Sequence, residues 1–226
     1  MANRAYLRVW TRDFSTQTMI AEFARFLTTA PLSEGKGRFR QLTVQAVDAA
    51  ETPVAEWSLR DAAVGPAEVA ALAALHLDDD TAFIVEAVWD LWSFDMETLK
   101  WSQGRQPLEL FCFGKAYDDG AAAGMGHLSA DLGFEHLFTG HAGLLALGAA
   151  KNPFENSDHP VERTFRSWMG NAENLKLYHQ KTRENIQKLF RWVEAVEAAL
   201  PVERSELWSE GEENFEARLD VILGQR

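Results

Sequence analysis

The chain has a single cysteine, fewer basic than acidic side chains and no long apolar run. One thiol excludes an intramolecular disulfide, and the apolar neighbours of Cys112 predict a core residue because they suppress the reactive thiolate. The longest weakly polar run, residues 142–150, is half of the roughly 18 residues that a membrane span requires. The first residues lack the apolar segment of a secretory signal. We therefore expect a cytoplasmic protein without a membrane partner.

The balance of charge is acidic, with 34 Asp and Glu against 22 Lys and Arg and a formal net charge of −12. This sign disfavours loose attraction to nucleic-acid phosphates and favours basic proteins, cations or neutral ligands as partners. Residues 4–40 are nevertheless cationic, whereas residues 41–100 are strongly anionic. Two interpretations are open: oppositely charged strands neutralise each other in a sheet, or the cationic segment is a local binding patch.

Hydrophobic periodicity predicts an α+β protein. The first six predicted elements are a strand at 4–12, a helix at 15–28, strands near 38–48 and 53–60, a helix from Gly65-Pro66, and a strand at 81–91. The order strand, helix, strand, strand, helix, strand is that of a ferredoxin-like (βαββαβ) fold, in which the first and third strands are central. Further strands are expected at 97–102 and 108–117, separated by a turn at 103–107, and near 128–132.

A segment rich in turn formers, residues 152–160, marks a boundary. It divides the chain into an α+β sheet domain, residues 1–150, and a helical C-terminal extension packed on it, residues 151–226. A long helix is expected from about residue 172 to Leu200, because Asn171 is a good N-cap and Pro201 stops the helix. Its apolar seam serves either the core of the same chain or a second such helix in a dimer.

The first strand alternates cations and aromatic rings on one face, and this pattern carries the functional hypothesis. A face of this kind suits a protein partner, a second copy of the chain or an anionic small ligand. Trp10 is expected to be accessible. The candidate contact residues are Arg8, Trp10, Arg12 and Arg60. The competing interpretation is that Arg8 and Arg12 form cross-strand ion pairs with acids such as Glu56, Glu86 and Asp90.

Nucleic acid is not the expected ligand of this face. The segment at the third strand, residues 54–59, lacks the signature of RNA-binding sheets, and nearby acids repel phosphates. The first hypothesis is therefore a non-catalytic binding protein without a cofactor.

A cluster of potential metal ligands supports the alternative, a small metal-dependent enzyme of the hydrolase type. His127, Asp131, His136 and His141 would bind a divalent metal such as zinc, with Glu135 as the base. Their spacing matches no known zinc motif. The other interpretation is that these histidines make ordinary hydrogen bonds at turns or half-buried positions.

Overall fold

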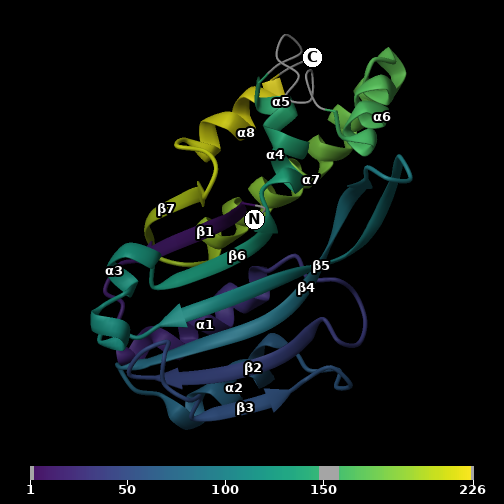
Figure 1. The fold of residues 1–226 in the computed structure, drawn as a ribbon. Helices are drawn as coiled ribbons and strands as arrows, with labels where there is room; N and C mark the ends of the chain where they lie inside the picture. Colours follow the sequence, from purple (N-terminus) through teal and green to yellow (C-terminus); the bar gives the residue numbers. More distant parts are fainter. Residues whose placement is uncertain (1–2, 148–157, 225–226) are drawn as a thin grey trace.

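The computed structural model describes residues 3–147 and 158–224. Its centre is a seven-stranded sheet in the order β3-β2-β4-β5-β6-β1-β7, in which every neighbouring pair is antiparallel (Figure 1). The strands are β1 (Arg4–Thr11), β2 (Phe39–Ala46), β3 (Ala55–Ser58), β4 (Thr81–Asp95), β5 (Lys100–Phe113), β6 (Leu128–Phe134) and β7 (Val202–Ser209). The α+β class with a large antiparallel sheet is therefore confirmed.

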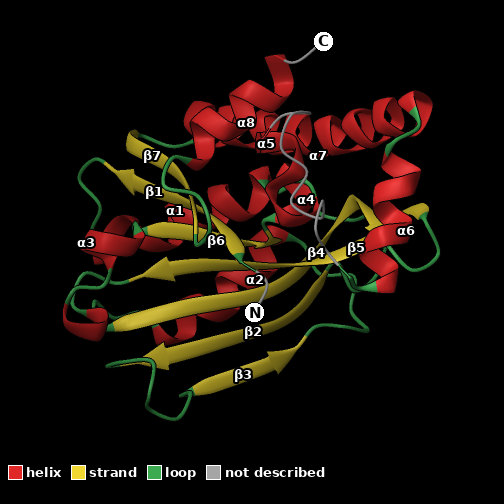
Figure 2. Ribbon diagram, turned by 45° about the horizontal axis from the view of Figure 1, so that its top comes forward, coloured by secondary structure: helices red, strands yellow, loops and turns green. Residues whose placement is uncertain are grey.

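Helices cover one face of this sheet. The α-helices are α1 (Thr16–Thr29), α2 (Pro66–Ala73), α3 (Ala122–Met125), α4 (His136–Thr139), α5 (Leu144–Leu147), α6 (Pro160–Met169), α7 (Ala172–Ala199) and α8 (Phe215–Gly224). Three short 3-10 helices are η1 (Ala74–His76), η2 (Tyr117–Asp119) and η3 (His141–Gly143). Figure 2 shows α1, α2 and α7 behind the strands, so the two main layers are a sheet and a helical layer. None of the described helices is long and apolar enough to cross a bilayer.

The core lies between these two layers. The small and branched residues of β1, Ala5, Leu7 and Val9, are fully buried against it, as the two-residue period predicts. Trp89 of β4 meets Trp192 of α7 edge to face, with ring centroids 5.9 Å apart. Such large buried rings tie the long helix to the sheet of its own chain.

Local signals position several helices correctly. Ser15 caps α1 through a capping box with Thr18, and Pro66 occupies the first turn of α2. The Asn171 side chain caps α7, which ends one residue before Leu200. The predicted seam of α7 packs within the chain, since Tyr178, Ile186 and Leu189 are buried in the core.

The ferredoxin-like topology is wrong. That fold needs β1 beside the third and fourth strands of the motif, whereas β1 here pairs with β6 and β7, and β3 is an edge strand. The β4–β5 and β5–β6 pairs join segments that follow each other in the sequence, and together they separate β1 from β2. Helix α1 therefore carries the chain across three strands to β2. Because the register of distant strands is not encoded in local periodicity, the order of the elements did not reveal this arrangement.

Two further corrections concern strands. The expected turn at 103–107 is part of the continuous strand β5. Pro107 is tolerated there because β6 pairs only with residues 109–112, which leaves one edge of β5 open. The C-terminal portion is also not purely helical, since β7 joins the sheet beside β1. Strand β7 is an edge strand with mostly polar residues. Its hydrophobic periodicity is therefore too weak to predict a strand from the sequence.

Candidate functional site

The predicted cation and aromatic face of β1 lies on the side of the sheet opposite α1 and α7. Strand β1 lies between β6 and β7, and the sequence analysis predicted neither strand as its neighbour. Arg4 donates from Nε to Oδ2 of Asp131 at 2.5 Å. Arg8 lies 4.4 Å from the ring centroid of Trp208 and 3.8 Å from Oε2 of Glu206. Both guanidinium groups therefore have partners within the sheet.

Trp10 is not an accessible anchor, contrary to the expectation. Only 9% of its surface is exposed, because Arg204 stacks on its ring at 3.7 Å and α3 covers its edge. Its Nε1 donates to the carbonyl oxygens of Ala122 and Ala123 at 3.1 and 3.2 Å. The indole thus connects α3 to the sheet.

The four candidate contact residues do not form one patch. Arg12 is exposed just beyond β1 and donates to the carbonyl oxygen of Val202 at 3.3 Å. Arg60 is also exposed but follows β3, at the far edge of the sheet. With β2, β4, β5 and β6 between β3 and β1, the two strands are roughly 24 Å apart. The structure brings Arg8 and Trp10 together on β1 and leaves Arg60 apart from them.

The predicted ion pairs of Arg8 and Arg12 with Glu56, Glu86 and Asp90 are absent among the described residues. The anionic segment 41–100 forms β2, β3 and β4, which are not neighbours of β1. The acids that neutralise β1 come instead from β6 and β7. Pairing partners depend on strand order, and that order differs from the predicted one.

Three carboxylates stand in register on the same open face. Glu86 of β4 lies opposite Glu109 of β5, and Glu109 lies opposite Asp131 of β6. Side chains directly opposite each other in a sheet have Cβ atoms about 5 Å apart, so like charges here repel. Arg4 compensates Asp131, whereas no described cation forms an ion pair with Glu86 or Glu109. We call Glu86, Glu109 and Asp131 the carboxylate row.

The electrostatic consequence is clearest at Glu109. Partial burial raises the pKa of its carboxyl group, and the charges of Asp131 and Glu86 add to this effect, while Arg4 opposes it. Beside the row, Ile84 pairs with Phe111, and both side chains are partly exposed. The open face thus combines uncompensated negative charge with an apolar strip.

The metal-ligand cluster predicted from the sequence is split by β6. His127 lies before this strand, where its Nδ1 accepts the backbone N–H of Thr11 at 3.1 Å and its ring stacks on Phe14. His136 lies beyond the other end, and seven residues of strand place it roughly 24 Å away. Asp131 is engaged by Arg4. The proposed set of ligands therefore does not converge.

His136 and His141 do come together, with ring centroids 4.7 Å apart. His136 also stacks on Phe134, and His141 lies against an aromatic cluster that includes Phe94, Phe165 and Tyr178. The Tyr178 hydroxyl oxygen accepts the backbone N–H of His141 at 3.0 Å and lies 2.7 Å from its Nδ1. Burial lowers the pKa of both imidazoles, and for His141 this effect, with a contribution from His136, gives a value of about 4.

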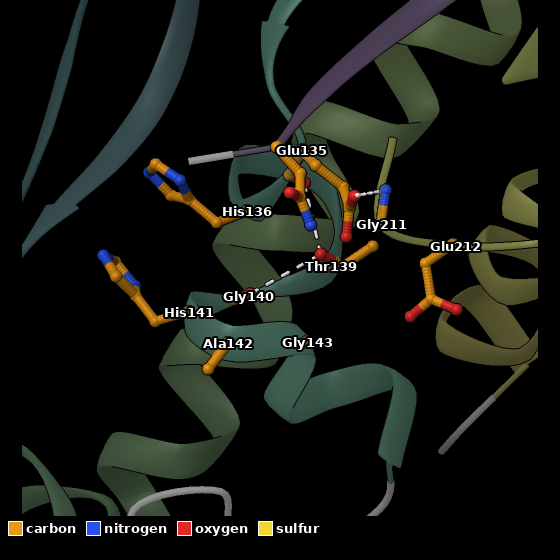
Figure 3. Close-up of a pocket in the computed structure, with 10 residues that line it drawn as sticks. Glu135, His136, Thr139, Gly140, His141, Ala142, Gly143, Gly211 and Glu212 are labelled. Carbon is orange, nitrogen blue, oxygen red and sulfur yellow. Dashed lines mark hydrogen bonds between the residues drawn. The ribbon is translucent and has the colours of Figure 1, made fainter. Parts of the chain in front are cut away.

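These histidines line a cavity of about 390 Å³ between the α4–η3 segment and the turn that joins β7 to α8. Figure 3 shows the imidazoles of His136 and His141 pointing to one side of the α4–η3 segment, away from the carboxylates of Glu135 and Glu212 on its other side. Glu135, the predicted base, is buried, and its Oε2 accepts the backbone N–H of Gly211 at 3.1 Å. Among residues 3–147 and 158–224, no three His, Cys, Asp or Glu side chains are arranged to hold a metal ion.

Sequence reasoning did not bring together the residues of these sites. Glu86 and Glu109 belong to different predicted strands, and only the β4–β5 register makes them neighbours. Glu212 is 77 positions after Glu135 and reaches the cavity because β7 returns the chain to β1.

The chain was compared with known protein families, curated proteins and solved structures. No family matches it, and no curated protein or solved structure was found to be similar.

Proposed function

We propose that the protein is a non-catalytic binding module whose open sheet face docks a basic partner protein. The observation that carries the proposal is the carboxylate row, Glu86, Glu109 and Asp131, in register on three adjacent central strands. Like charges directly opposite each other cost stability, and a basic partner would convert this cost into attraction.

The other two occupants expected from the sequence are less compatible with these contacts. An anionic ligand would need free cations, but Arg4, Arg8 and Arg204 already contact Asp131, Glu206 and Trp10. A symmetric dimer through this face would place identical patches against each other. With the carboxylate row at the centre of such an interface, the row of one copy would meet that of the other, which is electrostatically unfavourable.

The apolar strip beside the row defines the partner further. Ile84 and Phe111 are partly exposed next to the carboxylates. Lys and Arg side chains combine an apolar stem with a charged end. Such side chains fit a surface on which carboxylates lie beside apolar side chains. The partner surface is therefore expected to present basic residues on an apolar base rather than an isolated charge.

Site-specific cross-linking tests the location. A photo-reactive side chain at Phe111 should capture a partner from the source cells, whereas one at Leu75, exposed on η1, should not. The double variant Glu86→Gln/Glu109→Gln should lose the capture. Glu213→Gln/Asp220→Asn removes the same charge from exposed positions near the C-terminus and should retain it.

An oligolysine peptide provides a defined probe for the charge argument. Its affinity should fall about tenfold in Glu86→Gln/Glu109→Gln and stay near the wild-type value in Glu213→Gln/Asp220→Asn. Equal losses in the two variants would show that only net charge matters. That result, or equal cross-linking at Phe111 and Leu75, would refute the proposal.

A further inference from the structure

Strand β7 lies at the border of the sheet, so one of its two edges has no neighbouring strand (Figure 1). The backbone N–H of Glu210 donates to the carbonyl oxygen of Arg4, and bonding to β1 recurs at every second residue of β7. The residues between them turn their backbone groups away from β1: Glu203, Ser205 and Leu207. Within the described parts of the chain, no hydrogen bond engages these backbone groups. Such an edge can pair with a further strand.

The side chains of this edge strand carry charges of both signs. Arg204 and Glu206 lie on the open face of the sheet, where they contact Trp10 and Arg8 respectively. Their side chains remain 61% and 41% exposed, and the distance from Nη2 of Arg204 to Oε2 of Glu206 is 3.7 Å. Each side chain can therefore contact a second group of opposite charge.

Pairing with an identical strand about a two-fold axis has several possible registers, and the charges distinguish them. An axis at Glu203, Arg204 or Glu206 places that residue opposite its own copy, so like charges meet. An axis at Leu207 brings no two charges opposite each other. An axis at Ser205 places Arg204 opposite Glu206 of the second copy, and the symmetry repeats this pair. Opposite charges therefore face each other when the axis is at Ser205.

The same register uses the free backbone groups. With the axis at Ser205, Glu203 lies opposite Leu207 of the second copy, and Ser205 lies opposite its own copy. These residues form hydrogen-bonded pairs, in which both N–H and both C=O groups find partners. Val202 and Trp208, which are both partly exposed, lie opposite each other at the two ends. Charge, backbone and apolar side chains thus favour one register.

We propose that the protein forms a symmetric dimer in which the β7 strands of two copies pair antiparallel about an axis at Ser205. The two seven-stranded sheets then become one continuous sheet. Strands β1 and β7 of each copy separate its carboxylate row from the axis, so the two rows do not meet. The inference does not depend on the proposed docking of a basic protein on the open face.

Charge reversal tests the contact between copies. Sedimentation equilibrium should show a dimer for the wild type. Arg204→Glu places two acids opposite Glu206, and Glu206→Arg places two cations opposite Arg204. Each variant should raise the dissociation constant of the dimer about tenfold or more. An equimolar mixture of the two variants should dimerise nearly as the wild type does, because every charge then faces its opposite. Mixing changes no contact within one chain, so this recovery reports contacts between copies.

Cross-linking tests the position of the axis. Two residues that form a hydrogen-bonded antiparallel pair have Cα atoms about 5.5 Å apart, which suits a disulfide. Ser205→Cys should therefore give a covalent dimer under mild oxidation. The native Cys112 is buried and does not compete. The control Ser58→Cys, at an exposed position of the other edge strand β3, should stay unlinked.

Four results would overturn the inference. They are a wild type that is monomeric at its highest soluble concentration, a dimer that does not respond to either charge reversal, a mixture that does not recover, and equal cross-linking of Ser205→Cys and Ser58→Cys. The measurement on the wild type and the comparison of the two cysteine variants remain decisive even if a charge-reversed variant fails to fold.

Discussion

Arg204 lies over the ring of Trp10, with its guanidinium carbon 3.7 Å from the ring centroid, across the antiparallel pair of β1 and β7. The same indole donates to the carbonyl oxygen of Ala122 in α3. The Trp10 side chain of β1 therefore contacts both the edge strand β7 and the short helix α3. The aromatic and cationic pattern of β1 has a structural role at this position.

A double-mutant cycle should detect this relationship. Trp10→Leu removes both the aromatic ring and the N–H donor and should lower the free energy of unfolding by about 2–4 kcal/mol. Arg204→Ala should cost about 0.5–1 kcal/mol, because its side chain is exposed on the far side of the stack. Urea denaturation of the two single variants and the double variant should give a coupling of about 0.5 kcal/mol or more. Strict additivity would show that the stack contributes nothing.

Glu86→Gln should stabilise the protein by about 0.2–1 kcal/mol at pH 7, because it removes a like charge opposite Glu109. The pKa of Glu109 is raised above its ordinary value of 4.5, so in the pH interval between these two values the folded state holds more protons. The contribution of Glu109 to the free energy of unfolding therefore decreases as pH rises through this interval.

Urea denaturation at a series of pH values measures this decrease. As pH rises, the free energy of unfolding should fall less in Glu86→Gln than in the wild type. Glu213→Gln, at an exposed position far along the sequence from the row, serves as the control. A Glu86→Gln variant that is less stable than the wild type at pH 7 would contradict the repulsion.

Asn185 connects α7 to β4 by two hydrogen bonds and to α4 by a third. Its Oδ1 accepts the N–H of Trp92 at 2.8 Å, and its Nδ2 donates to the carbonyl oxygens of Trp92 and Leu137 at 2.9 Å each. Asn185→Leu leaves these backbone groups without their partner, so the free energy of unfolding should fall by about 3 kcal/mol or more.

The matched control is Gln187→Leu, an exposed position on the same helix, which should change stability by less than about 0.5 kcal/mol. Hydrogen exchange should also report faster exchange of the Trp92 amide in Asn185→Leu. A loss of stability equal to that of Gln187→Leu would exclude the proposed connection.

His141 should titrate near pH 4 in the folded protein. Its pKa is about 4, against an ordinary value of 6.5, because burial disfavours the charged imidazole. Between these two values the unfolded state binds the proton and the folded state does not. The contribution of His141 to the free energy of unfolding is thus complete above pH 6.5 and falls as pH decreases toward 4. NMR titration of the imidazole measures the midpoint directly, and a midpoint near 6.5 would refute the burial argument.

Local patterns predicted the elements whose ends and faces depend on short-range interactions. The Ser15 cap and Pro66 define the starts of α1 and α2, because they satisfy or remove backbone N–H groups within one turn. The two-residue period of β1 placed Leu7 and Val9 in the core and Arg8 on the opposite face. That division holds in any sheet, since it follows from the backbone of a single strand.

The same patterns did not reveal what each exposed side chain would meet. The sequence leaves Arg8 either to an external partner or to an acid of the anionic segment, whereas its partners in the structure are Glu206 and Trp208. The histidine cluster was predicted from proximity in sequence, but seven residues of extended strand separate His127 from His136. Distance along a strand grows with every residue, so neighbours in sequence at its two ends are far apart in space.

By itself, therefore, the sequence determined the α+β class, the helices α1, α2 and α7, and the two faces of β1, because helix caps and side-chain periods act within a few residues. Only the tertiary structure decided the strand order, the place of β7 beside β1, the alignment of Glu86, Glu109 and Asp131, and the meeting of His141 with Glu212 around one cavity. These arrangements depend on pairing between distant segments. Their register is selected by the packing of the whole sheet against its helices, which no short stretch of sequence specifies.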